Sequence, residues 1–273
     1  MSNTREPWKI TLIGAGNLAW HLGHALTNKG IGVSQVISRR IGAAQQLAQQ
    51  LHAASSDNLS LLEKNTDICI LCVSDDAIPQ VLNSLDPGNC LVIHTAGSVP
   101  MAVLSGSALH YGVLYPLQTF TREKQVAFEK IPLLIEGNSP EVLKRITRLA
   151  GSITDQVIPA DSNQRLSLHL AAVFASNFSN HMYALAEKIS REHGLSFELL
   201  RPLMEETTSK AISMSPVSAQ TGPAVRRNRT VIEKHLALLQ EHPDLQQLYK
   251  LISESIERVA MDNVSCEGGP GQS

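Results

Sequence analysis

The stretch Lys9-Ile10-Thr11-Leu12-Ile13-Gly14-Ala15-Gly16-Asn17-Leu18-Ala19 decides the fold. It begins with a short aliphatic run, which is typical of a strand buried on both faces. The run breaks at Gly14-x-Gly16-x-x-Ala19, and apolar residues then recur at helical spacing through Trp20, Leu22 and Leu26. A strand, a glycine turn and a helix in this order predict a dinucleotide-binding fingerprint. The alternative is an ordinary strand-to-helix turn that contains two glycines.

Each small residue of the fingerprint has its own physical role. Gly14 would make the tight turn, Gly16 would let the backbone approach a pyrophosphate, and Ala19 would let helix and strand pack closely. The free N–H groups of the first helical turn would face the phosphate oxygens. The expected pyrophosphate ligands are therefore Gly14, Ala15, Gly16, Asn17 and Leu18.

The end of the second predicted strand distinguishes between two cofactors. An NAD-binding unit usually has an Asp or Glu there, which accepts hydrogen bonds from the ribose. Here the strand is followed by Ser38, Arg39 and Arg40, and no acidic residue occurs between Glu6 and Asp57. A hydroxyl and guanidinium groups bind a 2′-phosphate, whereas a carboxylate would repel it. The sequence therefore predicts NADP(H); the alternative is that the two arginines only solvate the start of a helix.

Composition excludes several classes of partner. The 273-residue chain has a formal net charge of −2, so no broad field would draw it to nucleic acid or to an anionic membrane. No apolar run approaches the length of a membrane span, and residues 1–8 lack the apolar core of a signal peptide, so we expect a cytoplasmic protein. Cys69 and Cys72 form a C-x-x-C on a predicted strand, where an odd separation puts the thiols on opposite faces. We expect two buried cysteines and no metal site.

Strand and helix signals alternate through the first half of the chain. Strands are predicted at residues 10–13, 33–37, 52–55, 68–73, 90–95, 109–114, 132–135 and 154–158, with helices at 43–51, 59–64 and 141–150 and one beginning after Ser74. This alternation predicts an α/β fold of the Rossmann type with a doubly wound, mainly parallel sheet. Ligands of such sheets bind at the carboxyl ends of the strands. Further cofactor candidates are therefore Val73, Ser74, His94, Ala96 and Gly97, with His94 to Gly97 bordering the nicotinamide.

The pattern changes near residue 160, beyond which strand signals disappear. Helices are expected at 162–193, 197–213, 230–240 and 244–262, with a loop over 215–228 and a C-cap at Gly194. The predicted organisation is an NADP-binding domain over 1–160, an all-α domain for substrate binding and dimerisation over 161–265, and a flexible tail over 266–273.

The first of these helices is apolar nearly all round, as are helices buried in bundles or between subunits. Its polar residues fall within about one sixth of the wheel at ~100° per residue: Arg165, His169, Ser176, Asn180 and Glu187. Histidine is the residue type among them that serves most often as a proton donor, so His169 is the candidate proton donor. Asn180, Ser176 and, somewhat farther round the wheel, Asn177 could orient a substrate. The alternatives are a structural hydrogen-bond network or a stripe that faces water.

Two loops are further candidates. The loop over 220–228 combines small residues with two guanidinium groups, so Thr221 and Arg226 could bind a substrate carboxylate or phosphate. An interhelical loop with solvated arginines is the alternative. Tyr115–Phe120 joins polar and aromatic residues at a sheet end and could form the wall of a cleft.

These segments together resemble a known family over most of the chain. The motifs are Gly14-Ala-Gly-Asn-Leu-Ala19, His94-Thr-Ala-Gly-Ser98, Tyr115-Pro-Leu-Gln-Thr-Phe120, His169-Leu-Ala-Ala-Val-Phe174 with Asn177-Phe178, and Gln220-Thr-Gly-Pro223 with Arg226. They resemble the bacterial Rossmann-like proteins that carry a C-terminal helical domain of unassigned function and are commonly described as NADP-dependent oxidoreductases. The wider relatives are pyrroline-5-carboxylate reductase and the β-hydroxyacid dehydrogenases.

The resemblance implies roles as well as a fold. In the wider relatives, the helix after the nucleotide domain carries a Lys followed one turn later by an Asn. His169 is similar in position to that Lys, whereas Val173 stands one turn on. Relatives of this class are commonly dimers joined through the helical domain, which implies a homodimer here.

The expected function is that of an NADP-dependent oxidoreductase acting on a small anionic carbonyl, hydroxy or imino compound. Its expected catalytic residues are His169, Asn177 and Asn180, with Ser176, Thr221 and Arg226 binding substrate. The competing hypothesis is a non-catalytic NADP(H)-binding sensor or regulatory protein, because a fold alone does not establish catalysis.

Overall fold

The computed structural model describes residues 8–267 of the chain. The chain divides into two compact units, Met1–Met182 and Tyr183–Ser273. The helix that follows residue 160 stays with the first unit up to Met182.

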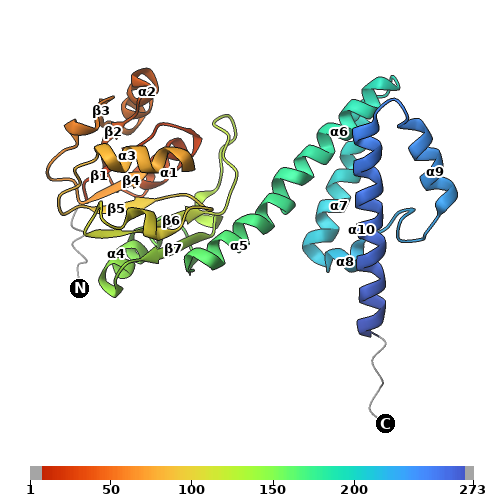
Figure 1. The fold of residues 1–273 in the computed structure, drawn as a ribbon. Coiled ribbons are helices and arrows are strands. Elements are labelled where there is room, and N and C mark those ends of the chain that lie inside the picture. The colour runs from red at the N-terminus through yellow and green to blue at the C-terminus, as the bar shows by residue number, and fades with distance from the viewer. Residues whose placement is uncertain (1–7, 268–273) are drawn as a thin grey trace, which may run out of the picture. The chain divides into compact units, whose positions relative to one another are not determined.

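The first unit is built on one sheet, whose strands lie in the order β3-β2-β1-β4-β5-β6-β7-β8 (Figure 1). The strands are β1 Ile10–Ile13, β2 Val33–Ile37, β3 Ala54–Ser56, β4 Ile68–Leu71, β5 Leu91–His94, β6 His110–Pro116, β7 Leu133–Gly137 and β8 Val157–Pro159. Neighbouring strands are parallel except β6 and β7, which are antiparallel. The predicted doubly wound, mainly parallel sheet is confirmed.

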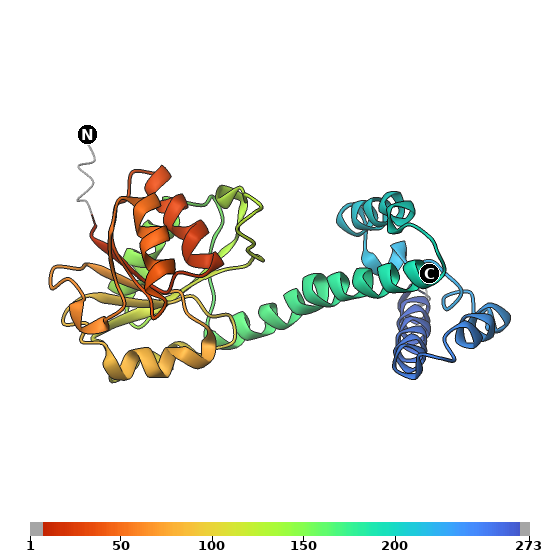
Figure 2. The same cartoon turned by 90° about the horizontal axis from the view of Figure 1, so that it is seen from above.

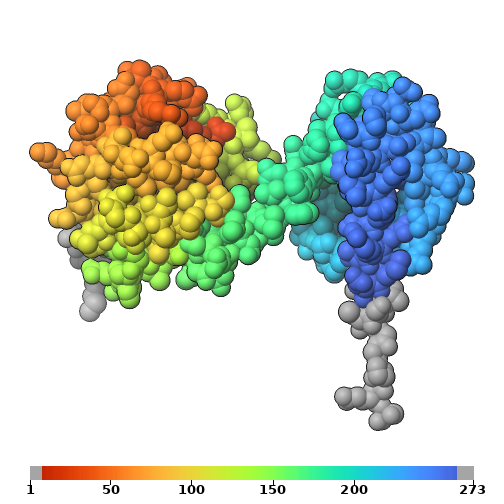
Figure 3. Space-filling model, in the orientation of Figure 1, coloured from red at the N-terminus to blue at the C-terminus, as the bar shows by residue number. Residues whose placement is uncertain are grey.

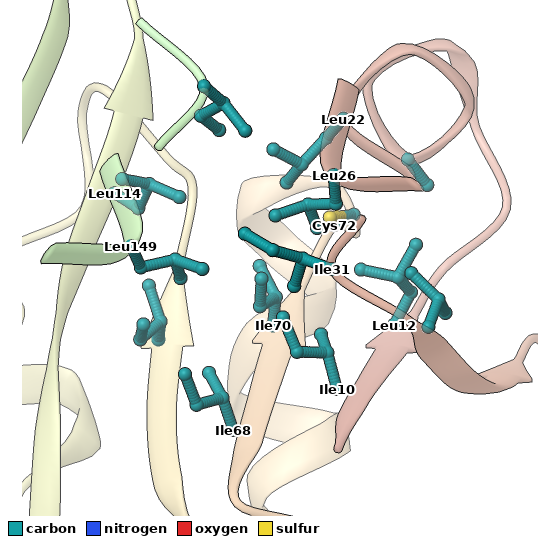
Figure 4. Close-up of a cluster of buried hydrophobic side chains, with 14 of the residues drawn as sticks. Ile10, Leu12, Leu22, Leu26, Ile31, Ile68, Ile70, Cys72, Leu114 and Leu149 are labelled. Atoms are coloured by element: carbon teal, nitrogen blue, oxygen red, sulfur yellow. The ribbon is translucent and has the colours of Figure 1, made fainter. Parts of the chain in front are cut away.

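Helices cover both faces of this sheet. They are α1 Asn17–Asn28, α2 Ile41–Leu51, α3 Ile78–Ser84 and α4 Pro140–Ala150. Side chains of α1, α2 and α4 share one buried cluster, whereas α3 belongs to a second cluster, so α1 and α3 lie on opposite faces (Figure 2). Leu22 and Leu26 of α1 pack near Ile70 and Cys72 (Figure 4). The strands β1, β4 and β5 are buried along their whole length, as their largely apolar sequences predict.

Two short helices differ from prediction in type. Residues 59–64 form only the 3₁₀ turn Leu59–Leu61. The helix after Ser74 begins as the 3₁₀ turn Asp75–Ala77 and becomes α-helical in α3, where Pro79 occupies the first turn. Proline is tolerated there because the first-turn N–H groups lack intrahelical acceptors.

The prediction that the two cysteines of the C-x-x-C are buried on opposite faces of the sheet is confirmed. Cys69 and Cys72 are both buried, and they belong to different clusters on opposite faces of the sheet. Among the described residues, no group of three or more His, Cys, Asp or Glu side chains could hold a metal ion.

One helical segment crosses the division between the units. It consists of α5 Ser162–Ala172, a π-helical turn over Val173–Phe178, and α6 Ser179–Glu192. Asp161 caps its start with a capping box completed by Gln164. Beyond its end Gly194 has φ +70, as expected for a C-cap. The prediction of an uninterrupted α-helix is therefore wrong at the π-helical turn.

The second unit is all helical. It continues with the 3₁₀ turn Phe197–Leu200, then α7 Arg201–Ser213, α8 Pro216–Ala219, α9 Arg229–Leu238 and α10 Pro243–Glu267. The single helical turn α8 lies within the predicted loop. Because α10 includes residues 266 and 267, the expected tail begins in a helix, and residues 268–273 lie outside the described part. Within residues 8–267, no helix is both long and apolar enough to cross a membrane.

Candidate functional site

A cavity of about 1150 Å³ opens at the carboxyl ends of β1, β2 and β4. Eight of the predicted cofactor residues line it: Gly14, Ala15, Gly16, Ser38, Arg39, Arg40, Val73 and Ser74. The edge of the sheet predicted to bind a dinucleotide is therefore hollow.

The glycine turn at one side of this cavity requires its small residues. Gly14 has φ +110, and a Cβ there would collide with the Cys72 carbonyl group. A Cβ on Gly16 would meet nothing within 4 Å. Gly14 thus permits the turn itself, whereas Gly16 leaves open space beside the start of α1.

The first turn of α1 is free to bind an anion. Gly16 is its N-cap and provides no side-chain hydrogen bond, so the first N–H groups of the 12-residue helix are not capped by it. The Asn17 side chain instead donates to the Phe120 carbonyl oxygen at 2.9 Å, and Leu18 packs against the core. Asn17 and Leu18 could contribute their backbone N–H groups to a pyrophosphate, but their side chains are engaged elsewhere.

The other side of the cavity carries the predicted phosphate-binding arginines. Arg39 and Arg40 are exposed, and Ser38 is fixed by its backbone N–H, which donates to the Ser56 carbonyl oxygen. Asp57, at the end of β3, also lines the cavity. The local charge is thus two guanidinium groups and one carboxylate, a balance that favours an anionic ligand.

A pair of aromatic side chains lies beyond the end of β5. The Tyr115 hydroxyl lies 2.9 Å from His169 Nδ1, and their rings meet edge to face. Both side chains press on Gly97: a Cβ there would lie 2.7 Å from His169 Nδ1 and 2.8 Å from Tyr115 Cζ. Because His169 and Tyr115 pack directly on the backbone of Gly97, a side chain at this position would displace them.

The surroundings keep the Tyr115 phenol protonated. Burial raises the pKa of Tyr115, and the nearby Asp75 carboxylate raises it further. A phenol that remains protonated at neutral pH can donate a hydrogen bond to Nδ1 of a neutral histidine. The histidine then carries its own proton on Nε2.

His94 differs from the role expected of it. Its side chain is fully buried, and its Nδ1 accepts a hydrogen bond from the Ala96 N–H at 3.2 Å. Burial, followed by the positive charge of Arg165, lowers the pKa of His94 to about 4. His94 is thus a neutral residue that shapes the turn through Ala96, and neither residue is among those that line the cavity.

Short contacts fix the loops after β4 and β5 to each other. Ser98 donates a hydrogen bond to the Asp75 carboxylate, and Thr95 donates to the Leu71 carbonyl oxygen at 2.9 Å. These contacts hold the turn that contains Gly97.

Arg165 is a structural residue. Its side chain is 1% exposed and donates to Glu136 at 2.5 Å and to the Val99 carbonyl oxygen at 2.6 Å. Ser162 joins the network by donating to the same carboxylate at 2.9 Å. The network fastens the start of α5 to β7 and to the loop after β5, so one residue of the predicted stripe belongs to the hydrogen-bonded alternative.

The π-helical turn changes which residues share a face with His169. Its hydrogen bonds run from i to i+5, so it holds about one residue more than an α-helix of the same length. One extra residue rotates the rest of the helix by about a quarter turn. Asn177 and His181 then align with His169, whereas Ser176 and Asn180 turn away from it. His181, an exposed residue, was not predicted.

Two predicted substrate residues lie in the second unit. Thr221 and Arg226 are both exposed, in the segment between α8 and α9. The Arg226 N–H donates to the Gly222 carbonyl oxygen at 3.4 Å, which makes this segment a turn.

Sequence reasoning missed several residues of the site. Asp57, Leu59 and Val81 line the cavity. Tyr115 was named only as part of a possible cleft wall, and its contact with His169 was not predicted. Asp57 lies two residues beyond the strand predicted at 52–55, and that position was the signal that could have identified it.

Two family models match different parts of the chain. Residues 9–97 match the family model described as "NADP oxidoreductase coenzyme F420-dependent", and residues 131–256 match a domain of unknown function. A solved structure from Bacteroides fragilis, provisionally designated an NADP oxidoreductase, is 41% identical with a TM-score of 0.86. The alignment covers 93% of this chain and 99% of that one. The chain belongs to this family of NADP oxidoreductases.

More distant structures share the fold of this NADP oxidoreductase. A Thermotoga maritima protein is 24% identical over 92% of this chain and 99% of its own, with a TM-score of 0.78. A reductive aminase from Aspergillus terreus, solved with NADPH and ethyl-5-oxohexanoate, is 15% identical over 97% of this chain and 96% of its own, with a TM-score of 0.70. None of the curated proteins compared with the chain matches it.

Proposed function

We propose that this oxidoreductase binds NADP(H) in the cavity at the ends of β1, β2 and β4 and reduces or oxidises a small anionic carbonyl, hydroxy or imino compound. The observation that carries the proposal is the Tyr115–His169 hydrogen bond against Gly97, near the nucleotide edge of the sheet. It supplies a proton-transfer pair where the fold is expected to hold a nicotinamide.

The cavity residues suit the cofactor. The uncapped start of α1 and the space beside Gly16 would accept a pyrophosphate, with backbone groups from Gly14 to Leu18 contributing. Ser38, Arg39 and Arg40 would bind the 2′-phosphate. Apolar residues such as Leu59 and Val81 would contact the adenine.

His169 would provide the proton. A bound nicotinamide supplies or accepts the hydride. In the protonated imidazole, Nδ1–H donates to the Tyr115 oxygen and Nε2–H is available to a carbonyl oxygen or imine nitrogen. After transfer from Nε2 the imidazole is neutral and keeps its other proton on Nδ1, which still donates to the Tyr115 oxygen. The hydrogen bond to Tyr115 would thus hold the ring in place while Nε2 gives up its proton and takes up another from water.

The remaining predicted residues would orient the substrate. Asn177 shares a face with His169 across the π-helical turn. Asn180 and Ser176 lie about a quarter turn away from that face and are proposed to contact the substrate from its side. Thr221 and Arg226 are proposed to bind the anionic group of the substrate. Residues 1–160 would thus act as the cofactor domain and 161–265 as the substrate and dimerisation domain.

Oxidation of NADPH with a panel of 2-oxo acids, aldehydes and cyclic imines tests this function. We expect His169→Ala to lower kcat by about 10²-fold or more. Tyr115→Phe should change the pH profile of NADPH oxidation, because His169 loses the hydroxyl that its Nδ1 contacts. The control Tyr111→Phe changes a tyrosine on the same strand and should do neither. If no substrate oxidises NADPH although NADPH binds, the sensor hypothesis is favoured instead.

We also propose that the protein is a homodimer. Leu170, Phe174 and Phe178, on α5 and the π-helical turn, are 58%, 62% and 47% exposed. Large apolar side chains exposed along a helix indicate a surface that a partner covers. Sedimentation velocity should show a dimer, and Phe174→Asp should shift the protein towards monomer.

A further inference from the structure

The segment between β6 and β7 lies against the nucleotide-binding turn. We call residues 117–122 the strap. The Asn17 side chain donates to the Phe120 carbonyl oxygen at 2.9 Å, and His21 Nε2 lies 3.0 Å from the Thr121 carbonyl oxygen. The Phe120 ring also lies 5.3 Å from the His21 ring, centroid to centroid. The strap is therefore fastened to the first two turns of α1.

Arg122, at the end of the strap, reaches the glycine turn itself. Its Nη2 donates to the Ala15 carbonyl oxygen at 2.6 Å, and its Nη1 donates to Gln46 of α2 at 3.1 Å. The guanidinium carbon lies 4.9 Å from the centroid of the Trp20 ring. Three elements thus hold one half-buried guanidinium group in place.

The bond to Ala15 fixes the direction of a neighbouring N–H. The Ala15 carbonyl and the Gly16 N–H belong to one planar trans peptide, in which the two groups point in opposite directions. By holding the oxygen, Arg122 turns the Gly16 N–H away from itself. Ala15 and Gly16 line the cavity, and Arg122 is not among its lining residues in the described chain, so the arginine holds the turn from outside.

We infer that Arg122 is a positioning residue that presets the Gly14–Asn17 turn for the pyrophosphate of the dinucleotide. This inference rests on the proposed NADP(H) site. Two sets of residues would then have different effects on binding. Arg122, outside the cavity, would govern affinity for any dinucleotide, whereas Ser38, Arg39 and Arg40 would govern the choice between NADP(H) and NAD(H).

Isothermal titration of Arg122→Gln with NADPH and NADH tests the inference. We expect both dissociation constants to rise about tenfold, the scale of one charge-assisted hydrogen bond, with their ratio unchanged. Arg122→Lys keeps the charge but lacks the planar fork, so it should also weaken binding. Arg148→Ala is the control, because the Arg148 guanidinium carbon also lies over a tryptophan, 5.0 Å from the centroid of the Trp8 ring. This variant should leave both dissociation constants unchanged.

Hydrogen exchange in the free protein gives an independent readout. Arg122→Gln should speed exchange of the amides of residues 15–19 while the amides of β1 and β4 stay protected, which also shows that the variant is folded. Unchanged dissociation constants and unchanged exchange would overturn the inference, as would a loss confined to NADPH. Wild-type protein that binds neither dinucleotide would instead overturn the cofactor site, and the inference with it.

Discussion

The two units of the chain bury their apolar residues to very different extents. In the first unit, strands such as β1 and β4 are buried along their whole length, and α1, α2 and α4 complete a continuous core (Figure 4). In the described part of the second unit, the buried side chains are Ala224, Ile232, Leu239 and Glu257. The exposed apolar side chains of the second unit include Leu203, Ile212 and Leu251. Leu251 belongs to α10, the blue helix on the face of the molecule seen in Figure 3.

This difference indicates how each unit is stabilised. The first unit buries most of its apolar surface by its own folding, apart from residues near its end such as Phe174 and Phe178, whereas the second unit exposes apolar side chains along several helices. A second copy of the chain is the proposed cover. Substitutions in the first unit should therefore change its stability, and those on exposed apolar positions of the second should change association.

The largest effect is expected from breaking the buried ion pair. Arg165→Ala leaves the Glu136 carboxylate without a positive partner, with only the Ser162 hydroxyl donating to it, and should lower the free energy of unfolding by about 3–5 kcal/mol. Arg191→Ala is the control, because the Arg191–Glu187 pair has a similar distance of 2.7 Å but is exposed, and it should change stability by less than about 0.5 kcal/mol. Urea unfolding of both variants measures the difference; similar small losses would contradict the buried network.

Matched leucine-sized truncations test the comparison directly. Ile70→Ala, in the core of the first unit, should cost about 2–5 kcal/mol in urea unfolding. Leu203→Ala, at a position that is 62% exposed, should cost less than about 0.5 kcal/mol in dilute monomer but weaken self-association in sedimentation equilibrium. A costly Leu203→Ala in the monomer would mean that the second unit is stabilised by its own packing.

Acid should destabilise the first unit through His94. The pKa of His94 is lowered to about 4 in the folded protein, from 6.5 for an ordinary histidine, so the unfolded chain binds more protons between these values. The contribution of neutral His94 to the free energy of unfolding is complete above pH 6.5. It is lost as the pH falls towards 4, by about 3 kcal/mol in total. Unfolding free energies measured from about pH 4 to 7 should show this slope, and His94→Asn should reduce it. An equal slope in the variant would show that other groups cause it.

A smaller effect is expected at Gly97. Gly97→Ala places a methyl group against His169 and Tyr115 and should cost about 1–3 kcal/mol of stability. It should also separate the pair, so the pH profile of NADPH oxidation should resemble that of Tyr115→Phe. Gly32→Ala, where a Cβ would meet nothing within 4 Å, is the control. A stable Gly97→Ala protein with an unchanged profile would contradict the described packing.

Local patterns were sufficient to predict the nucleotide unit. The run at Ile10–Ile13, the two glycines and the alternation of later segments each follow from short-range sequence, and the sheet has the strands that they predict. The division of Cys69 and Cys72 between two faces followed from strand periodicity alone.

Other features depend on contacts that no local pattern contains. Tyr115 and His169 are 54 residues apart, and Arg122 and Ala15 are 107 apart, so the sheet topology brings each pair together. The π-helical turn adds about one residue to a helix without a distinctive composition, and a wheel drawn at a constant angle therefore misplaces Ser176 and Asn180. The structural role of Arg165 depends on Glu136 in β7, which the helix sequence does not reveal.

We propose that the cavity beside Arg39 and Arg40 binds a 2′-phosphorylated dinucleotide. Isothermal titration of NADPH and NADH against wild-type protein and the double variant Arg39→Ala/Arg40→Ala tests it most directly. We predict that the wild type binds NADPH at least about tenfold more tightly than NADH, and that the double variant loses this preference by weakening NADPH alone. Equal affinities in the wild type, or a preference that survives in the double variant, would contradict the claim.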